Sequence, residues 1–273
     1  MGTGHPRVEI TAATLAGGEK NQDRYGYGDG WAFVLDGASS FATTQLEHDG
    51  GWYADHLKEG LSAGLERGIH HSTAEIVEEA IRTVADLHGD DAASCPTSTI
   101  ALARWCHERV EVYLLGDSTA SLIAATSEEE LSDSRVADVG RTIREEYRSR
   151  LTAGHGFTEE HRQLLQRLQA EQAAARNQPG GYWIAGSDPK AANHGLTLTR
   201  SLSGIDALVL ATDGAAAGCT YGIFSSWGAF AQCDLETILR EVHEAESRDP
   251  EGIQWPRSKP HDDKTAIVIH GPL

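Results

Sequence analysis

Apolar and polar residues alternate along two stretches near the start of the chain. The segments RVEITAATL (7–15) and RYGYGDGWAFVLDG (24–37) show the two-residue period of half-buried strands. Asp29-Gly30 divides the second segment, and an Asp-Gly pair between two apolar runs is a strong signal for a tight hairpin turn. The pattern therefore predicts strands here, two of them joined by a hairpin.

The spacing changes to that of helices over the following residues. From Trp52 to Leu65 and from Ser72 to Leu87, apolar residues recur every three or four positions, and acidic residues occupy the opposite face. This pattern predicts two amphipathic helices. Alternation then returns in TSTIALARW (97–105) and RVEVYLLGDSTASLIAA (109–125), which predicts further strands in an antiparallel meander.

A charged region separates these strands from the last ones. Residues from about Glu128 to Asn177 have a helical pattern with a break at TAGHGF (152–157), which favours a solvated helix pair covering a sheet. Beyond it, strand patterns are found at 195–202, 206–212 and 262–271, and a helix is expected near Leu235 to Ala245. Strands, then helices, then strands again predict an α+β fold with antiparallel sheet. No internal repeat or long linker divides the 273 residues, so we expect a single domain.

The net charge of the chain limits the kinds of partner that it can bind. The chain has 41 acidic and 23 basic residues and a formal net charge of −18, which would repel nucleic acid and anionic membranes. The N-terminal sequence lacks the pattern of a secretory leader, and no window approaches the roughly 18 apolar residues of a membrane helix. We therefore expect a cytoplasmic protein with no nucleic-acid or membrane partner.

The four cysteines are far apart in the sequence. Cys95, Cys106, Cys219 and Cys233 form no CxxC pair and have no histidine at zinc-finger spacing. The spacing therefore indicates buried thiols, with neither a disulfide framework nor a structural zinc.

Four aspartates stand at the ends of apolar runs. Asp36 and Asp213 each follow a run and precede glycine, Asp262 directly precedes a run, and Asp23 precedes a predicted strand. Hard divalent cations prefer oxygen ligands, and strand ends hold carboxylates on rigid supports. Any one of these residues is more typical of a turn or a helix cap, as we expect for Asp29. Together they indicate a metal site suited to hydrolytic chemistry.

Six motifs in order along the chain resemble those of the metal-dependent protein phosphatase family (PPM, the protein phosphatase 2C type), in a bacterial-like single-domain form. They are KNQD, VLDG, TSTIALA, LLGDS, LATDG and HDDKTAIVI, within a match from about Val8 to Ile269. The resemblance implies a four-layer α-β-β-α sandwich of two antiparallel sheets, with a two-metal centre at one end. It also implies a helical flap or insert at about residues 125–206 of a domain spanning 1–273.

The resemblance assigns a role to each aspartate. Asp36 would bridge two Mn²⁺ or Mg²⁺ ions with help from the Gly37 carbonyl, Asp213 and Asp262 would hold one ion, and Asp23 would hold water on the other. A metal-bridging hydroxide would then attack phosphorus in line, so no side-chain nucleophile is required.

A weaker third metal is implied at Asp117, although the other acid commonly used there is replaced by Ala217. The alternative for Gly116-Asp117-Ser118 is a bend between strands in which Asp117 bonds its own backbone. Both interpretations remain open from the sequence.

Three positions depart from the family pattern. Gln22 stands where glutamate is frequent, which keeps an oxygen ligand but removes a charge. Gly18 stands where an arginine grips the substrate phosphate, and the nearest cations are Lys20, the better substitute, and Arg24. Ala38 stands where some members have a histidine as general acid, so the general acid is unassigned.

The expected function is that of a Mn²⁺- or Mg²⁺-dependent phosphoserine/phosphothreonine protein phosphatase, acting as a monomer on phosphoprotein substrates. One alternative is a phosphatase of a small phosphorylated metabolite, favoured by the missing arginine and the lack of a recognition module. The other is a catalytically weak phosphoprotein-binding regulator, motivated by the departures. The intact Asp36, Asp213 and Asp262 favour catalysis, because clustered carboxylates repel one another without a cation.

Overall fold

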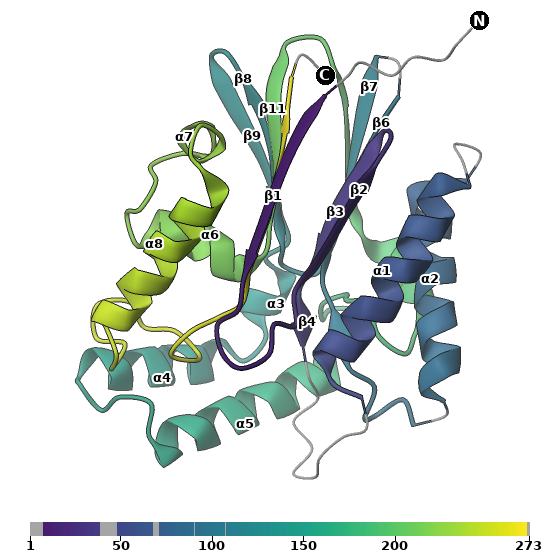
Figure 1. Cartoon of the computed structure of the whole chain (residues 1–273). Coiled ribbons are helices and arrows are strands. Elements are labelled where there is room, and N and C mark those ends of the chain that lie inside the picture. The colour runs from purple at the N-terminus through teal and green to yellow at the C-terminus, as the bar shows by residue number, and fades with distance from the viewer. Residues whose placement is uncertain (1–7, 39–47, 68–70, 90, 107, 272–273) are drawn as a thin grey trace, which may run out of the picture.

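Two five-stranded antiparallel sheets pack face to face in the computed structural model, and helices cover both outer faces (Figure 1). The structure describes residues 8–38, 48–67, 71–89, 91–106 and 108–271. The strand order is β1-β12-β11-β8-β9 in the first sheet and β10-β7-β6-β3-β2 in the second. The α+β class and the four-layer α-β-β-α arrangement are those predicted from the sequence.

The first sheet joins the two ends of the chain. Its strands are β1 (Glu9–Leu15), β12 (Lys264–His270), β11 (Ile205–Ala211), β8 (Thr119–Ala124) and β9 (Ser127–Ser132). Strand β12 lies between β1 and β11, with Ala266 opposite both Ala13 and Ala211. The residues that precede β12 therefore lie beside the loop that follows β1.

The second sheet contains the predicted hairpin. Its strands are β2 (Arg24–Gly28), β3 (Trp31–Leu35), β6 (Ile100–Cys106), β7 (Arg109–Leu115) and β10 (Leu196–Ser201). Gly30 in the β2–β3 turn has a φ of 81°, a conformation that glycine adopts without strain. At one end of the sandwich, the short strands β4 (Gly37–Ala38) and β5 (Thr97–Ser98) pair with each other.

Central strands such as β3 are buried on both faces. Ala32 and Val34 face the layer between the sheets, while Phe33 and Leu35 face the helices, so all five residues of WAFVL are buried. This two-sided burial explains why the run is continuously apolar. The end of β3 is consequently a rigid support for the residue that follows it.

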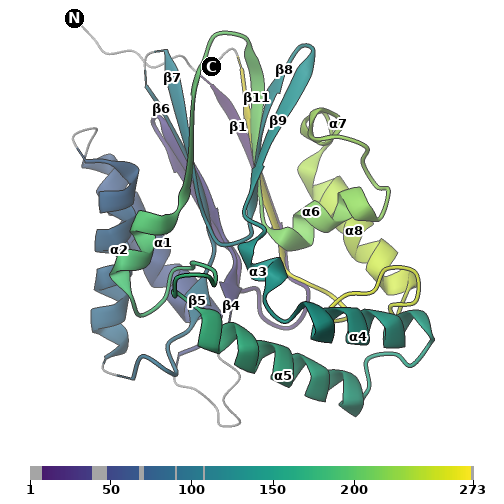
Figure 2. The ribbon, with the colours of Figure 1, turned by 180° about the vertical axis from the view of Figure 1, so that it is seen from behind.

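The helices form the outer layers (Figure 2). On the second sheet lie α1 (Gly50–Glu66), α2 (Thr73–His88) and the 3₁₀ helix η1 (Pro189–His194). On the first sheet lie α6 (Asp213–Thr220), α7 (Trp227–Ala231) and α8 (Leu235–Arg248). Asp49 caps α1, and Ser72 with Glu75 forms a capping box on α2, which fixes both predicted helices at their N-termini. Among the described residues, no helix is long and apolar enough to cross a membrane.

Three further helices lie across one end of the sandwich: α3 (Arg135–Asp138), α4 (Arg141–Thr152) and α5 (Glu159–Ala175) (Figures 1 and 2). The predicted break is present, with positive φ angles at Gly154 and Gly156. However, α4 and α5 do not cover a sheet as predicted. They pack on each other through a cluster of their own, because their short apolar stripes suffice only for mutual contact.

Two further predictions from pattern were wrong. Residues 127–132 form the edge strand β9 instead of a helix, because Glu128 and Glu130 accept hydrogen bonds from Trp227 on α7 while the backbone pairs with β8. The meander is also absent, since β8 leaves the sheet of β6 and β7 and joins the other one. The change of sheet occurs at Gly116, whose φ is 92°.

The cysteines and the short helices also differ from expectation. Cys95 is buried, whereas Cys106 is half-buried and Cys219 and Cys233 are exposed, so the prediction of buried thiols is right only for Cys95. The α6 and α7 helices have too few turns for a periodic signal, and the sequence analysis did not predict them.

Candidate metal centre

The predicted aspartates converge at one end of the sandwich. Asp36 follows β3, Asp213 is the first residue of α6, Asp262 precedes β12 and Asp23 precedes β2. Burial, and then the negative charges of the other three carboxylates, raise the pKa of Asp36 well above its ordinary value. Mutual repulsion of this kind requires that the groups lie close together. The structure therefore brings together side chains that are separated by up to about 240 residues in the sequence.

Asp36 and Asp213 lie close enough to interact electrostatically. The negative charge of Asp213 is one of the causes that raise the pKa of Asp36. Protein atoms crowd Asp213 although its side chain is exposed to solvent, and this crowding, followed by the charge of Asp117, raises its pKa. A cation bound between these carboxylates would relieve their repulsion.

Asp23 contains an oxygen without a partner. The side chain is only 2% exposed. Its Oδ2 accepts a hydrogen bond of 2.8 Å from the Thr212 hydroxyl, while Oδ1 is buried and has no hydrogen-bond partner in the described part of the chain. Burial raises the pKa of Asp23 to about 8, against the opposing effect of the Thr212 bond. A buried oxygen of this kind is costly unless a water or a cation satisfies it, so the donor set fits the implied ions.

Glycines allow the loops of the cluster to approach closely. A Cβ atom on Gly37 would lie 2.4 Å from the Gly50 carbonyl oxygen and 2.6 Å from that of Gln22. A Cβ atom on Gly214 would lie 2.0 Å from the Asp263 carbonyl oxygen. The glycine of each Asp-Gly motif is thus required by backbone packing, which holds the preceding aspartate in place.

Asp262 forms an ion pair with the basic residue Lys259. Lys259 Nζ lies 2.5 Å from Asp262 Oδ1, and the lysine side chain remains 53% exposed. Burial, followed by the charge of Asp213, raises the pKa of Asp262 to about 6, while Lys259 opposes this shift. Lys259 also interacts electrostatically with Asp36. The sequence analysis missed Lys259, whose one signal was its position three residues before a candidate ligand.

The second aspartate of the HDD motif has a structural role. Asp263 accepts hydrogen bonds from the backbone N–H groups of Gly17 at 2.7 Å and Gln22 at 2.8 Å. Both carboxylate oxygens are therefore used to hold the β1–β2 loop, which carries Asp23. The sequence analysis named Asp262 as a ligand and assigned no role to Asp263.

A buried ion pair fixes the same segment from the other side. Lys264 is fully buried and donates to Glu246 Oε2 on α8 and to the backbone oxygen of Asp262, each at 2.7 Å. The segment before β12 is thereby tied to both the β1–β2 loop and α8. Neither residue of this pair was predicted, because a lysine and a glutamate 18 positions apart carry no local signal.

Asp117 lies at the edge of the cluster. Burial is the first cause that raises its pKa, and Arg144 of α4 opposes this shift. Its charge in turn acts on Asp213. Gly116 and Asp117 form a bend between β7 and β8, and Asp117 also lies near the other carboxylates, so both interpretations from the sequence stay open.

The two cations predicted to bind phosphate are engaged elsewhere. Lys20 Nζ lies 2.9 Å from Asp49 and its side chain is 77% exposed. Arg24 forms a two-pronged pair with Asp55 at 2.5 and 2.9 Å and also donates to the carbonyl oxygens of Asn21 and Asp23. These bonds make Arg24 a brace for the loop that carries Asp23.

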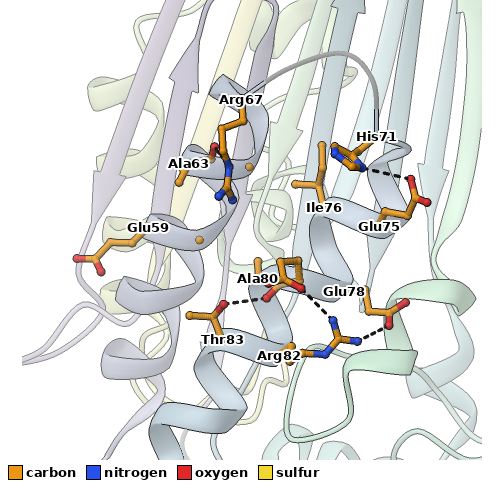
Figure 3. Close-up of a pocket in the computed structure, with 13 residues that line it drawn as sticks. Glu59, Ala63, Arg67, His71, Glu75, Ile76, Glu78, Ala80, Arg82 and Thr83 are labelled. Carbon is orange, nitrogen blue, oxygen red and sulfur yellow. Dashed lines mark hydrogen bonds and ion pairs between the residues drawn. The ribbon is translucent and has the colours of Figure 1, made fainter.

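A cavity of about 760 Å³ lies away from the acids, in the groove between α1 and α2 (Figure 3). Gly60 and Gly64 let the helices approach, since a Cβ on Gly64 would meet Ile76 at 2.7 Å. The charges at its rim are paired, with Arg82 bound to both Glu78 and Glu79. We therefore interpret it as a packing groove without chemistry of its own.

Similarity to known proteins is found at the level of structure and not of sequence. No family model and no curated protein matches the sequence. Among solved structures, the serine/threonine phosphatase Stp1 from Staphylococcus aureus is 15% identical, covers 97% of this chain and 96% of its own, and has a TM-score of 0.58. The PPM Ser-Thr phosphatase MsPP from Mycobacterium smegmatis, in complex with cacodylate, is 20% identical, with coverages of 96% and 97% and a TM-score of 0.56.

The catalytic domain of the serine/threonine protein phosphatase PstP, in complex with two manganese ions, is 15% identical, covers 96% of this chain and 97% of its own, and has a TM-score of 0.52. This chain has the PPM phosphatase fold. The fold implied by the motif series is thereby confirmed. Sequence identities this low establish the fold alone, so the activity must be inferred from the residues of this chain.

Proposed function

We propose that this protein is a divalent-cation-dependent phosphoric monoester hydrolase that removes phosphate from phosphoserine and phosphothreonine in proteins. The observation that carries the proposal is the cluster of Asp23, Asp36, Asp213 and Asp262, with the mutual repulsion of its carboxylates and the buried, unpartnered oxygen of Asp23. Support comes from the fold, which it shares with serine/threonine phosphatases, one of which binds two manganese ions.

The proposed ligands are the carboxylates of Asp36, Asp213 and Asp262, the Gly37 carbonyl and, through water, Asp23, with Asp117 as a weaker outlying site. Two Mn²⁺ or Mg²⁺ ions, when bound, would acidify a water molecule and neutralise phosphoryl oxygens, so no side-chain nucleophile is needed. The protein's own contribution is positional, through the Thr212 bond to Asp23 and the anchoring of the segment before β12.

For the substrate phosphate, Lys259 is better placed than Lys20 or Arg24. Lys259 is half-exposed and faces Asp262, whereas Arg24 is bound to Asp55. If Asp262 bound a metal ion, the Lys259 ammonium group would be free to donate a hydrogen bond to a phosphate oxygen. A lysine provides one point charge where an arginine would provide a fork. The substrate phosphate would thus be held by one lysine and no arginine, which keeps a small phosphorylated metabolite as the second candidate substrate.

The helices α4 and α5 are proposed to form the flap of this site, within the region 125–206. His161 on α5 donates a 2.8 Å hydrogen bond to the backbone oxygen of Ser258, the neighbour of Lys259. Arg144 on α4 acts on Asp117. We further propose a single domain over residues 1–273 that works as a cytoplasmic monomer, without a nucleic-acid or membrane partner.

The test is hydrolysis of a phosphothreonine peptide and of p-nitrophenyl phosphate by metal-stripped protein, with Mn²⁺ or Mg²⁺ added back. We expect restored turnover that Asp36→Asn and Asp213→Asn abolish. Asp29→Asn is the matched control, because it changes an Asp-Gly pair that lies in a hairpin turn and Asn-Gly suits such a turn.

The ratio of the two rates separates the candidate substrates. A preference for the peptide supports a protein phosphatase, and a preference for the small ester supports a metabolite phosphatase. Cation binding with tight peptide binding and no turnover would replace both with the phosphoprotein-binding regulator.

A further inference from the structure

A second group of potential metal ligands lies behind the acid cluster. His243 and Glu246 are one turn apart on α8, and His261 lies on the segment before β12. One ligand atom from each of the three residues lies within 4.8 Å of the others. Two imidazoles and a carboxylate form a donor set that zinc uses in proteins, with water as a further ligand.

The His243 ring contains a nitrogen without a hydrogen-bond partner among the described residues. This atom, Nδ1, is buried. The ring stacks on His261 with a centroid separation of 4.1 Å and an interplanar angle of 18°. Burial, followed by the proximity of His261, lowers the pKa of His243, so the ring is held in the neutral form that binds metals. A buried lone pair without a partner is what a cation would satisfy.

Glu246 and His261 are already in contact. His261 Nδ1 lies 3.1 Å from Glu246 Oε2, and Lys264 Nζ lies 2.7 Å from the same oxygen. These bonds of the carboxylate both go to Oε2, so among the described residues they leave Oε1 as a ligand atom for a cation.

Lys264 also determines which cation the group selects. Its ammonium already balances the charge of Glu246, so the group offers little net negative charge to a hard ion such as Mg²⁺. The remaining affinity rests on the two imidazoles, which favour zinc and similar transition metals. In the acid cluster the donors are carboxylates alone, which favour Mg²⁺ or Mn²⁺.

We propose that His243, Glu246 and His261 form a separate binding site for a transition-metal cation of the zinc class, distinct from the acid cluster. The ion would tie α8 to the segment that carries Asp262. The site does not depend on phosphatase activity, since none of its three residues contacts the proposed substrate.

The test measures zinc binding directly, with zinc-free protein in the Asp36→Asn background and excess Mg²⁺, so that the acid cluster does not compete. We expect one Zn²⁺ per chain by equilibrium dialysis, and Co²⁺ in its place with the absorption spectrum of mixed nitrogen and oxygen ligation. Adding His243→Ala should weaken binding by at least about 10–100-fold, the range for loss of even an outer-shell partner. His155→Ala, which changes an exposed histidine outside the group, should leave binding unchanged.

Equal zinc affinity with and without His243→Ala would overturn the proposal. His243→Gln, which keeps the size and polarity of the side chain, guards against a folding defect, and both variants are compared by melting temperature in EDTA. Zinc binding is measured without substrate, so its absence leaves the phosphatase proposal intact. Likewise, an inactive protein that binds zinc at this group leaves the present inference intact.

Discussion

Two groups of charged side chains lie on either side of the segment before β12, and they differ in how their charge is balanced. Glu246 and Lys264 are buried and neutralise each other within the protein at 2.7 Å. Asp23, Asp36 and Asp213 lie close enough for mutual repulsion to contribute to the raised pKa values of Asp23 and Asp36. Glu246 already has a counterion, so it would hold a cation only together with His243 and His261, whereas the acid cluster is suited to bind cations through carboxylates alone. The first group therefore serves mainly as scaffold, and the second is the candidate centre.

The largest effect that would sharpen this contrast is on activity. Asp213→Asn should lower the metal-dependent phosphatase rate by more than about 100-fold, beyond the range for an outer-shell partner. The same change should raise the melting temperature of the metal-free protein, because it removes one of the repelling charges. Activity assays test the fall in rate, and thermal unfolding in EDTA tests the rise in melting temperature. A variant that loses activity and stability in parallel would contradict the assignment.

The next effect is on stability and concerns the scaffold pair. Lys264→Met should destabilise the protein by about 3–5 kcal/mol, because it leaves the Glu246 carboxylate buried and unpaired. The double variant Lys264→Met/Glu246→Leu should recover most of this loss, since an apolar pair can replace a buried ion pair. Urea unfolding measures both free energies. Equal stability of the single and double variants would mean that the pair does not act as a unit.

A third effect is the pH dependence of the metal-free protein. The pKa of Asp23 is raised to about 8 in the folded state, so between about pH 4 and pH 8 the folded state binds a proton that the unfolded state has released. Stability must therefore fall as pH rises through this window, at up to about 1.4 kcal/mol per pH unit for one group. Asp23→Asn should flatten the profile, and so should saturating Mg²⁺. Stability in EDTA that is constant from pH 5 to pH 8 would refute this.

The smallest expected effect is on KM, and it distinguishes Lys259 from Lys20 as the residue that contacts the substrate phosphate. Lys259→Met should raise KM for the phosphopeptide by roughly 10-fold, the effect expected when a hydrogen bond to a charged group is lost. Lys20→Met should leave KM unchanged, because its ammonium is at the surface beside Asp49. Steady-state kinetics on the two variants decides between them. An increase in KM for Lys20→Met alone would return the phosphate contact to the residue first predicted from the sequence.

Local signals explain what the sequence could predict. The Asp29-Gly30 hairpin, the helices α1 and α2 and the buried strands come from periodicity and turn chemistry, which act within a few residues. The ordered aspartate motifs indicated that Asp36 and Asp213 belong to one site. The structure brings these carboxyls close enough to interact electrostatically, and their role as metal ligands stays a prediction.

Contacts between distant residues explain what was missed. Strand β9 has four consecutive exposed acidic or polar residues, and only pairing with β8 and bonds to α7 make it a strand. His243 meets His261 only when the segment before β12 packs on α8. Lys259 lies three residues from Asp262, but it reaches Asp36 and Asp213 only through the fold. Such convergence depends on the whole fold, and single-sequence periodicity does not contain it.

The position of β12 has a consequence for synthesis of the protein. This strand is the last of the described chain, yet it lies between β1 and β11, and β1 has no other partner in its sheet. While the chain emerges from the ribosome, β1 must wait for about 250 further residues before it can pair. Asp262 arrives together with β12, so the acid cluster is completed only at that final step. A nascent or truncated chain that lacks this strand is therefore unable to assemble the centre, however much of the rest has folded.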